Sequence, residues 1–180
     1  NTLLSFKNIN VNAATKMGKT PLIVSCEKGN KQVVDTLIQY NNEKKLKKKN
    51  NVVDFNAKTK EGKTALLISC EYSRMNIVES LLEIDDIECD DATNDGRTPL
   101  CYACDKNNEN IVSQLIHHHA NVNYHTPDGR SILYFACCSK NANIVRNILE
   151  MIDDKSQINQ KENINGTTPL FIACQNGDLE

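Results

Sequence analysis

Cysteine is the residue type of this 180-residue chain best suited to metal or redox chemistry, with eight copies. Cys101 and Cys104 form a C-x-x-C motif, a spacing found in zinc sites. Five cysteines, however, each follow a glycine by eight residues: Cys26, Cys70, Cys104, Cys137 and Cys174. Such recurrence predicts a packing position, in which a reduced thiol behaves as a small apolar group. We therefore expect no metal site, and we expect Cys138 to be the partly exposed, reactive thiol.

Three consecutive histidines, His117–His119, also suggest acid–base or metal chemistry. Adjacent residues on a helix point about 100° apart, so the three side chains cannot converge on one ion. We place them at the end of a helix, where cationic groups are favourable. His119 stands where a glycine would usually end that helix, which predicts backbone strain. The sequence carries no hydrolase, nucleotide-binding or zinc-protease motif, so we expect neither a cofactor nor an enzyme.

A run of lysines, Lys44–Lys49, is interrupted only by Leu46 and lies in an insertion at about residues 41–52. The first interpretation is a solvated, flexible loop. The alternative is a nuclear localisation signal or a contact with an acidic surface. The chain has 21 Lys and Arg against 23 Asp and Glu, which predicts no general attraction to nucleic acid or to an anionic membrane. Without a signal peptide or an apolar run near the ~20 residues of a membrane span, we expect the cytoplasm, with the nucleus as the alternative.

These residues are placed by a sequence repeat that five glycines mark: Gly18, Gly62, Gly96, Gly129 and Gly166. Successive glycines are 44, 34, 33 and 37 residues apart, which a unit of about 33 residues with insertions explains. Periods of this length indicate a solenoid, in which each unit buries its apolar face against its neighbours.

Each unit begins with a turn at the glycine and continues into two helices. A Thr or Ser two residues after the glycine is a good N-cap, and Pro follows it in three units. A leucine core anchor comes next, at Leu22, Leu66, Leu100, Leu133 and Leu170. The first helix should stop at Gly29, Ser73, Asn107, Lys140 and Gly177, of which Ser73 and Lys140 suit a left-handed C-cap poorly and predict looser turns. Apolar pairs four residues apart give the second helix one buried stripe that includes Val33 and Leu149.

The run G-x-T-P-L-x-x-A-C, followed by I-V-x-x-L-L and then N-V-N, resembles the ankyrin repeat. The resemblance covers nearly the whole chain, in four full units and one truncated unit, although Ala65 and Ile132 replace the Pro of the family. It implies an all-α, helix-turn-helix solenoid of the ankyrin type, a right-handed stack with its turn tips projecting to one side.

We divide the chain into residues 1–17, the end of a preceding repeat and its loop, and residues 18–180, the repeat array. The last unit stops where its second helix should begin, and neither end shows a polar cap. We therefore expect the parent protein to be longer.

In ankyrin-like arrays the turn tips and the exposed side of the first helix line the concave surface that usually receives a partner. The matching positions here are the two residues before each glycine, the residue after it, and the ninth and tenth after it. They are Lys16, Met17, Lys19, Glu27, Lys28, Lys60, Glu61, Lys63, Glu71, Tyr72, Asn94, Asp95, Arg97, Asp105, Lys106, Pro127, Asp128, Arg130, Cys138 and Ser139.

Two charge rows run through these positions. The basic row is Lys19, Lys63, Arg97 and Arg130, and the acidic row, eight residues later in the first three units, is Glu27, Glu71 and Asp105. Either the rows neutralise each other as exposed pairs, worth roughly 0–1 kcal/mol each, or the basic row stays partly free and attracts an acidic segment of a partner. We expect unpaired positive charge to be greatest at Arg130, because Cys138 occupies the acidic position of that unit.

The resemblance thus implies a monomeric, non-enzymatic scaffold that binds another protein through its concave face. Two alternatives stay open. The array is the targeting module of a larger multidomain enzyme, or it belongs to a nuclear factor that uses the Lys44–Lys49 loop.

Overall fold

The computed structural model describes residues 4, 6, 9–46, 52–153 and 155–177. The α-helices are Pro21–Lys28 (α1), Lys31–Leu46 (α2), Ala65–Glu71 (α3), Met75–Leu82 (α4), Pro99–Asp105 (α5), Glu109–His117 (α6), Ile132–Cys138 (α7), Ala142–Met151 (α8) and Pro169–Asn176 (α9). A short 3-10 helix, η2, spans Lys155–Asn159. The β-type pairing found among the described residues is a single bridge between His125 and Ser131. The prediction of an all-α chain is confirmed.

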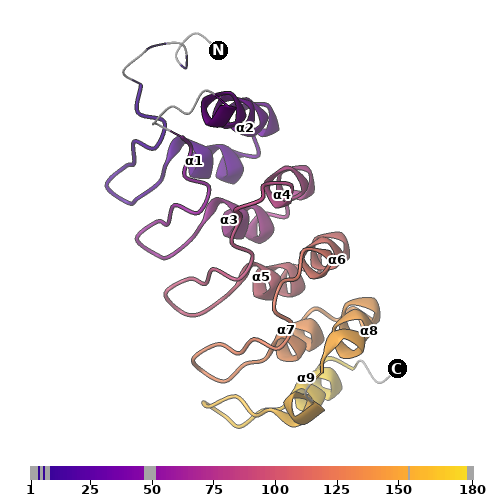
Figure 1. The fold of residues 1–180 in the computed structure, drawn as a ribbon. Coiled ribbons are helices and arrows are strands. Elements are labelled where there is room, and N and C mark those ends of the chain that lie inside the picture. Colours follow the sequence, from indigo (N-terminus) through magenta and orange to yellow (C-terminus); the bar gives the residue numbers. More distant parts are fainter. Residues whose placement is uncertain (1–3, 5, 7–8, 47–51, 154, 178–180) are drawn as a thin grey trace. The chain divides into compact units, whose positions relative to one another are not determined.

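The chain divides into two compact units, Asn1–Glu88 and Cys89–Glu180. In the first unit α1 packs on α2 and α3, and α4 packs on α3 and α2. In the second unit α7 packs on α5, α8 and α9, and α6 packs on α5 and α8. Within each unit the first helices of successive pairs stack together, and the long loops between pairs extend to one side of the stack (Figure 1). Each unit is therefore a short solenoid of helix-turn-helix repeats.

A hydroxyl side chain fixes the start of every first helix. The residues are Thr20, Thr64, Thr98, Ser131 and Thr168, and each has extended backbone. Each hydroxyl oxygen accepts a hydrogen bond from the backbone N–H three residues later, at 3.2–3.4 Å. An N-cap of this kind is worth about 1 kcal/mol, and its recurrence sets the position of every repeat along the chain.

The leucine anchor is buried in every repeat except the last. Leu66 and Leu100 are 0% exposed, whereas Leu170 is 64% exposed, and Cys174 on the same helix is exposed as well. The prediction that Leu170 and Cys174 pack in the core is therefore wrong. Among the described residues no second helix pairs with α9, which leaves this face of the helix uncovered.

Two residues of the predicted buried stripe on the second helices are also exposed. Val33 on α2 is 45% exposed and Leu149 on α8 is 43% exposed. Their neighbours Val34 and Ile148 are 0% exposed. The stripe that is actually buried is therefore narrower at these helices than the sequence pattern predicts.

The turn between the two helices of a pair has the same left-handed backbone whichever residue occupies it. Gly29 has φ 72°, and Ser73, Asn107 and Lys140 have φ 54°, 53° and 58°. The prediction of looser turns at Ser73 and Lys140 is therefore wrong. A residue with a Cβ adopts this conformation at a cost of roughly 1–2 kcal/mol, which the packing of the two helices offsets. His119, just after α6, has φ 62° and is strained as predicted.

The lysine run begins inside a helix. α2 continues to Leu46, and the Lys44 ammonium lies 4.7 Å from the centroid of the Tyr40 ring. Lys45 reaches the carboxylate of Asp86 at 3.4 Å. The prediction of a flexible loop is therefore wrong for residues 44–46, and residues 47–49 lie outside the described part of the chain.

Replacing Lys140 with glycine should stabilise the protein by about 0.5–1 kcal/mol. Glycine adopts a φ of 58° without steric cost, and this gain exceeds the extra entropy that glycine adds to the unfolded chain. The midpoint of urea unfolding, followed by circular dichroism, measures the change.

Lys140→Ala is the matched control, because it removes the long side chain but keeps the Cβ. We expect it to leave the unfolding midpoint close to that of the native protein. Equal stabilisation by Lys140→Ala and Lys140→Gly would show that strain at this φ is not the cause.

Candidate functional site

Each of the four full repeats has a threonine three residues before the glycine that marks the repeat. This threonine holds the loop tip that carries the predicted partner-binding residues. The backbone N–H groups of Thr15, Thr59, Thr93 and Thr126 each donate to the carbonyl of the basic-row residue, at 2.9–3.0 Å. Their hydroxyl oxygens accept the N–H of that same residue at 3.0–3.2 Å. We did not predict these threonines, although T-x-x-G recurs in all four full repeats.

Neighbouring tips within a unit touch through their backbones. In the first unit the N–H of Lys60 donates to the carbonyl of Met17 at 3.0 Å. A Cβ on Gly18 would lie 3.0 Å from the Cα of Thr59, and the φ of Gly18 is 80°. The close approach and the positive φ together require glycine at this position. Neighbouring tips within this unit are thus held close together, which fixes the positions of the side chains beside them.

Glu162 takes the place of the threonine in the last tip, which is one residue longer. Its carboxylate accepts hydrogen bonds from the N–H groups of Ile164, Asn165 and Thr167 and from the Thr167 hydroxyl, at 2.6–3.2 Å. Burial raises the pKa of the Glu162 carboxyl, but these hydrogen bonds lower it by more, so that the pKa lies below its usual value. The next residue, Asn163, ties this tip to the preceding one by donating its N–H to the carbonyl of Asp128 at 2.8 Å.

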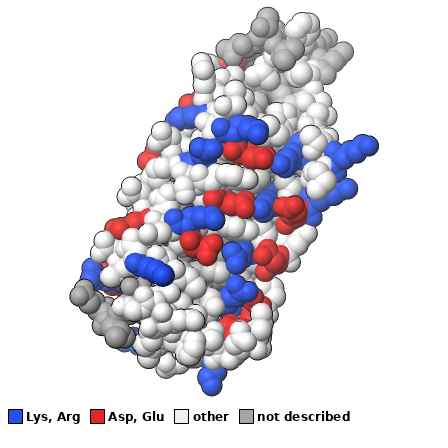
Figure 2. Space-filling model, turned by 180° about the vertical axis from the view of Figure 1, so that it is seen from behind, with Lys and Arg blue, Asp and Glu red and all other residues white. Residues whose placement is uncertain are grey.

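The basic row pairs with the acidic row in the first three repeats. The distances are 2.7 Å for Lys19–Glu27, 2.8 Å for Lys63–Glu71 and 3.7 Å for Arg97–Asp105. In Figure 2, basic and acidic side chains lie next to one another over much of the surface in view. Of the two interpretations open from the sequence, the structure therefore shows mutual neutralisation of the rows.

In the fourth repeat the basic-row residue, Arg130, pairs with an acid outside the acidic row. Arg130 forms an ion pair with Asp128, two residues before it in the tip. Its guanidinium also lies over the ring of Tyr134, 5.9 Å from the centroid. Burial raises the pKa of Asp128, but hydrogen bonds from Thr126 and Arg130 lower it by more. The prediction that Arg130 carries unpaired charge is therefore wrong, since Asp128 replaces the acid missing at Cys138.

A pocket of about 120 Å³ opens between the tips and the first helices of the first unit. It has nine lining residues, and seven of them belong to the predicted partner-binding set: Met17, Lys19, Glu27, Glu61, Lys63, Glu71 and Tyr72. Met17 and Tyr72 are 50% and 47% exposed. The fold thus brings predicted positions from two repeats into one hollow, where exposed apolar groups lie between ion pairs.

The remaining predicted residues are distributed over the same tips and helices. Those exposed are Lys16, Lys28, Lys60, Asn94, Asp95, Asp105, Lys106 and Pro127. Cys138 is half-buried. Ser139 is buried, and its hydroxyl donates to the carbonyl of Ala136 at 2.6 Å, so it is unsuited to contact a partner.

The buried thiols lie in surroundings that disfavour the thiolate. Burial raises the pKa of Cys26 to about 11 and that of Cys104 well above its usual value. Cys138 is partly exposed as predicted, but burial raises its pKa, and Cys174 is more exposed. We therefore expect Cys174 to react before Cys138. Within the described part of the chain, no three His, Cys, Asp or Glu side chains are grouped to hold a metal ion.

Comparison with known families agrees with this geometry. The family model for ankyrin repeats (3 copies) matches residues 44–126 and 118–180, which is most of the chain. The chain belongs to the ankyrin-repeat family. Ankyrin repeats are generally protein–protein interaction modules and typically lack catalytic activity. A comparison with curated proteins finds no match. No helix in the described residues has the length and apolar character needed to cross a membrane.

Glu162→Gln should make the stability of the protein less dependent on acid pH. Because the pKa of Glu162 is lower in the folded protein than its unfolded value of about 4.3, the carboxylate stabilises the fold above that pH. The stabilisation is lost as the pH falls through the folded pKa. Urea unfolding at pH 7, 5, 4 and 3 should show a stability gap between native and variant that narrows at the acid end. A gap that stays constant to pH 3 would contradict the lowered pKa.

Iodoacetamide applied to the folded protein at pH 7.5 should label Cys174 before Cys138. Cys174 is exposed, whereas Cys138 is half-buried and has a raised pKa. Peptide mass spectrometry over a time course measures the order. Labelling in 6 M guanidinium provides the control, because both thiols should then react at similar rates. Faster labelling of Cys138 in the folded protein would contradict the half-buried position and the raised pKa of this thiol.

Proposed function

We propose that this ankyrin-repeat protein binds another protein through its loop tips and the exposed sides of its first helices, the concave face of the array. The observation that carries the proposal is the pocket in the first unit, because seven of its nine lining residues come from the positions predicted for partner contact. The two lysines that line this pocket are paired with glutamates, and its exposed side chains include Met17 and Tyr72. Such a pocket suits a protein partner better than a nucleic acid, whose phosphates attract unpaired cations.

Tyr72 and Met17 would supply most of the binding free energy. Tyrosine is frequent among interface hot spots because it buries a large area and loses little rotational freedom. Both side chains are half-exposed and surrounded by polar groups, the arrangement in which a partner excludes water from an apolar centre.

The ion pairs beside the pocket would determine orientation and specificity. Lys19 and Lys63 are already held by Glu27 and Glu71, so a partner need not order them on binding. An acidic segment of the partner would share these cations with the two glutamates. Charge should therefore affect the association rate and the choice of partner more than the affinity.

The test is a pull-down from source-cell lysate with the native protein and two variants that keep the fold. Tyr72→Ala should weaken capture of the partner by about 30-fold or more, the effect of losing a 2 kcal/mol hot spot. The double variant Lys63→Glu/Glu71→Lys keeps the ion pair but exchanges its ends, and it should weaken capture by a smaller factor that shrinks at high salt.

Val33→Ala is the matched control, since Val33 is a similarly exposed apolar residue on the second helix α2. It should leave capture unchanged. If Val33→Ala abolishes capture while Tyr72→Ala does not, the partner binds on the side of the second helices and the proposal is wrong.

A further inference from the structure

The two loop tips of the first unit carry an excess of positive charge. In each full repeat the two residues before the glycine and the residue after it form the tip. These residues are Lys16, Met17 and Lys19 in the first repeat and Lys60, Glu61 and Lys63 in the second. With four lysines against one glutamate, the two tips together have a net charge of +3.

The tips of the second unit do not share this excess. The corresponding residues are Asn94, Asp95 and Arg97 in the third repeat and Pro127, Asp128 and Arg130 in the fourth. Each arginine forms an ion pair with the aspartate of its own tip. These tips are therefore neutral, which shows that the repeat fold itself does not require charged tips. The excess in the first unit points instead to recognition.

The excess comes from Lys16 and Lys60, which stand where the second unit has Asn94 and Pro127. Both lysines are exposed. The backbone hydrogen bond from Lys60 to the carbonyl of Met17 brings their two tips side by side. Ammonium groups on adjoining tips repel each other, and an anion bound beside both would relieve this repulsion.

The pocket beside Tyr72 opens next to these two lysines, since each of them is followed in sequence by a residue that lines it. The apolar part of the lining is Met17, Ile68 and Tyr72. The volume of about 120 Å³ is that of roughly four water molecules, which admits one side chain of about the size of leucine. The first unit thus combines a pocket for one apolar side chain with cations beside it.

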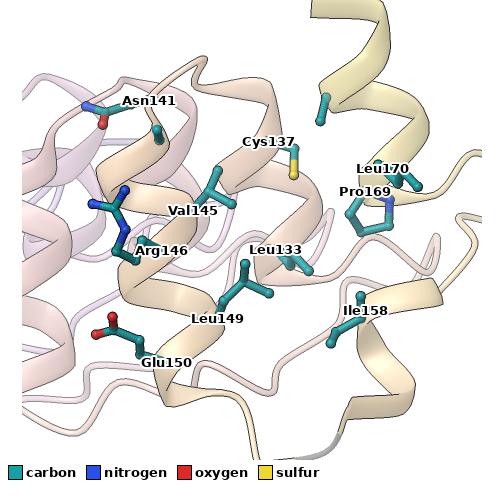
Figure 3. Close-up of a pocket in the computed structure, with 12 residues that line it drawn as sticks. Leu133, Cys137, Asn141, Val145, Arg146, Leu149, Glu150, Ile158, Pro169 and Leu170 are labelled. Carbon is teal, nitrogen blue, oxygen red and sulfur yellow. The ribbon is translucent and has the colours of Figure 1, made fainter. Parts of the chain in front are cut away.

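The larger hollow of the second unit has a different character. It has a volume of about 630 Å³ between α7, α8, η2 and α9, and its lining includes Leu133, Val145 and Leu149 (Figure 3). Its lining also includes one base and one acid, Arg146 and Glu150, which offset each other (Figure 3). An anionic segment would therefore distinguish the pocket of the first unit from this hollow.

We propose that the protein segment bound at the first unit is acidic, with one apolar residue in the pocket and a carboxylate on each side of it. This inference rests on the proposed use of the pocket beside Tyr72. The carboxylates would lie near Lys16 and Lys60, whose charge attracts them. The basic row beside the pocket is already paired with Glu27 and Glu71, so the tip lysines would determine the preference for an acidic segment.

The spacing of the two tips gives the pattern of the segment. Helices α1 and α3 pack on each other, so the repeats that carry the tips are about 10 Å apart. In an extended chain alternate side chains share a face, and residues four positions apart are separated by about 13 Å. Flexible lysine side chains can bridge the difference. The expected pattern is therefore an acid, any residue, an apolar residue, any residue and an acid.

Three fluorescent 12-residue peptides test the proposal by anisotropy. The first has the central sequence Glu-Ser-Leu-Ser-Glu, the second has Gln in place of both Glu, and the third has Ala in place of Leu. The native 180-residue protein should bind the first about fivefold more tightly than the second, as expected for two exposed ion pairs. This advantage should disappear in 1 M salt. The third should bind more weakly than the first at any salt concentration, because it leaves the pocket unfilled.

Charge reversal at the tips tests the assignment to the two lysines. Lys16→Glu/Lys60→Glu should bind the first peptide about 20-fold more weakly than the native protein, since two attractive pairs become repulsive. It should bind the second peptide unchanged. Arg146→Glu/Lys155→Glu is the matched control, because it changes the net charge equally at exposed positions of the second unit, and it should leave both affinities unchanged. Circular dichroism should show both variants folded.

The outcomes separate this inference from the proposed function. Equal binding of the first two peptides, equal effects of the two double variants, or no binding of the first peptide at about 1 mM would overturn the acidic pattern and leave the pocket proposal in place. Equal binding of the first peptide by native protein and Tyr72→Ala would contradict the use of the pocket itself. A single-stranded RNA bound more tightly than the first peptide, through the same two lysines, would overturn the assignment to a protein segment.

Discussion

Each helical pair in this chain has an apolar side that only a neighbouring pair can cover, and the rest of the structure depends on this constraint. Leu66 and Leu170 occupy the same position of their repeats, yet Leu66 is fully buried and Leu170 lies largely exposed. Close stacking also explains the small residues Ser69, Ala103 and Ala136 on the first helices, all of them buried. Burial in a stack is thus a property of adjacent repeats, and the same residue type is core or surface according to what lies beside it.

Stacking also determines what the surface can do. The glycine tips approach one another closely enough for backbone hydrogen bonds, as between Lys60 and Met17. Side chains of different repeats, such as Tyr72 and Met17, consequently line one pocket. Rigid tips allow the paired charges around that pocket to be held in place before a partner arrives. The scaffold provides position, and the residues placed on it provide recognition.

The parts of the structure that follow from local chemistry could be predicted from the sequence. The N-caps, the paired helices and the positive φ of His119 each depend on residues within a few positions of one another. The parts that were missed depend on geometry that the repeat pattern does not contain. The pairing of Arg130 with Asp128 needs the backbone of the tip, and the role of Glu162 needs the extra residue that lets its carboxylate reach three N–H groups. The exposure of Leu170 depends on what packs against α9, and the start of the lysine run inside α2 depends on the contacts of Lys44 and Lys45 with Tyr40 and Asp86.

Site-specific photo-crosslinking is the most direct test of the account, because it reports which surface a bound protein touches. Tyr72 would be replaced by a photoreactive phenylalanine in one sample and Val33 in another, and both would be irradiated in source-cell lysate. The account predicts one discrete crosslinked protein from position 72 and none from position 33. A crosslinked protein from position 33 alone would contradict it, because the partner would then lie against the second helices.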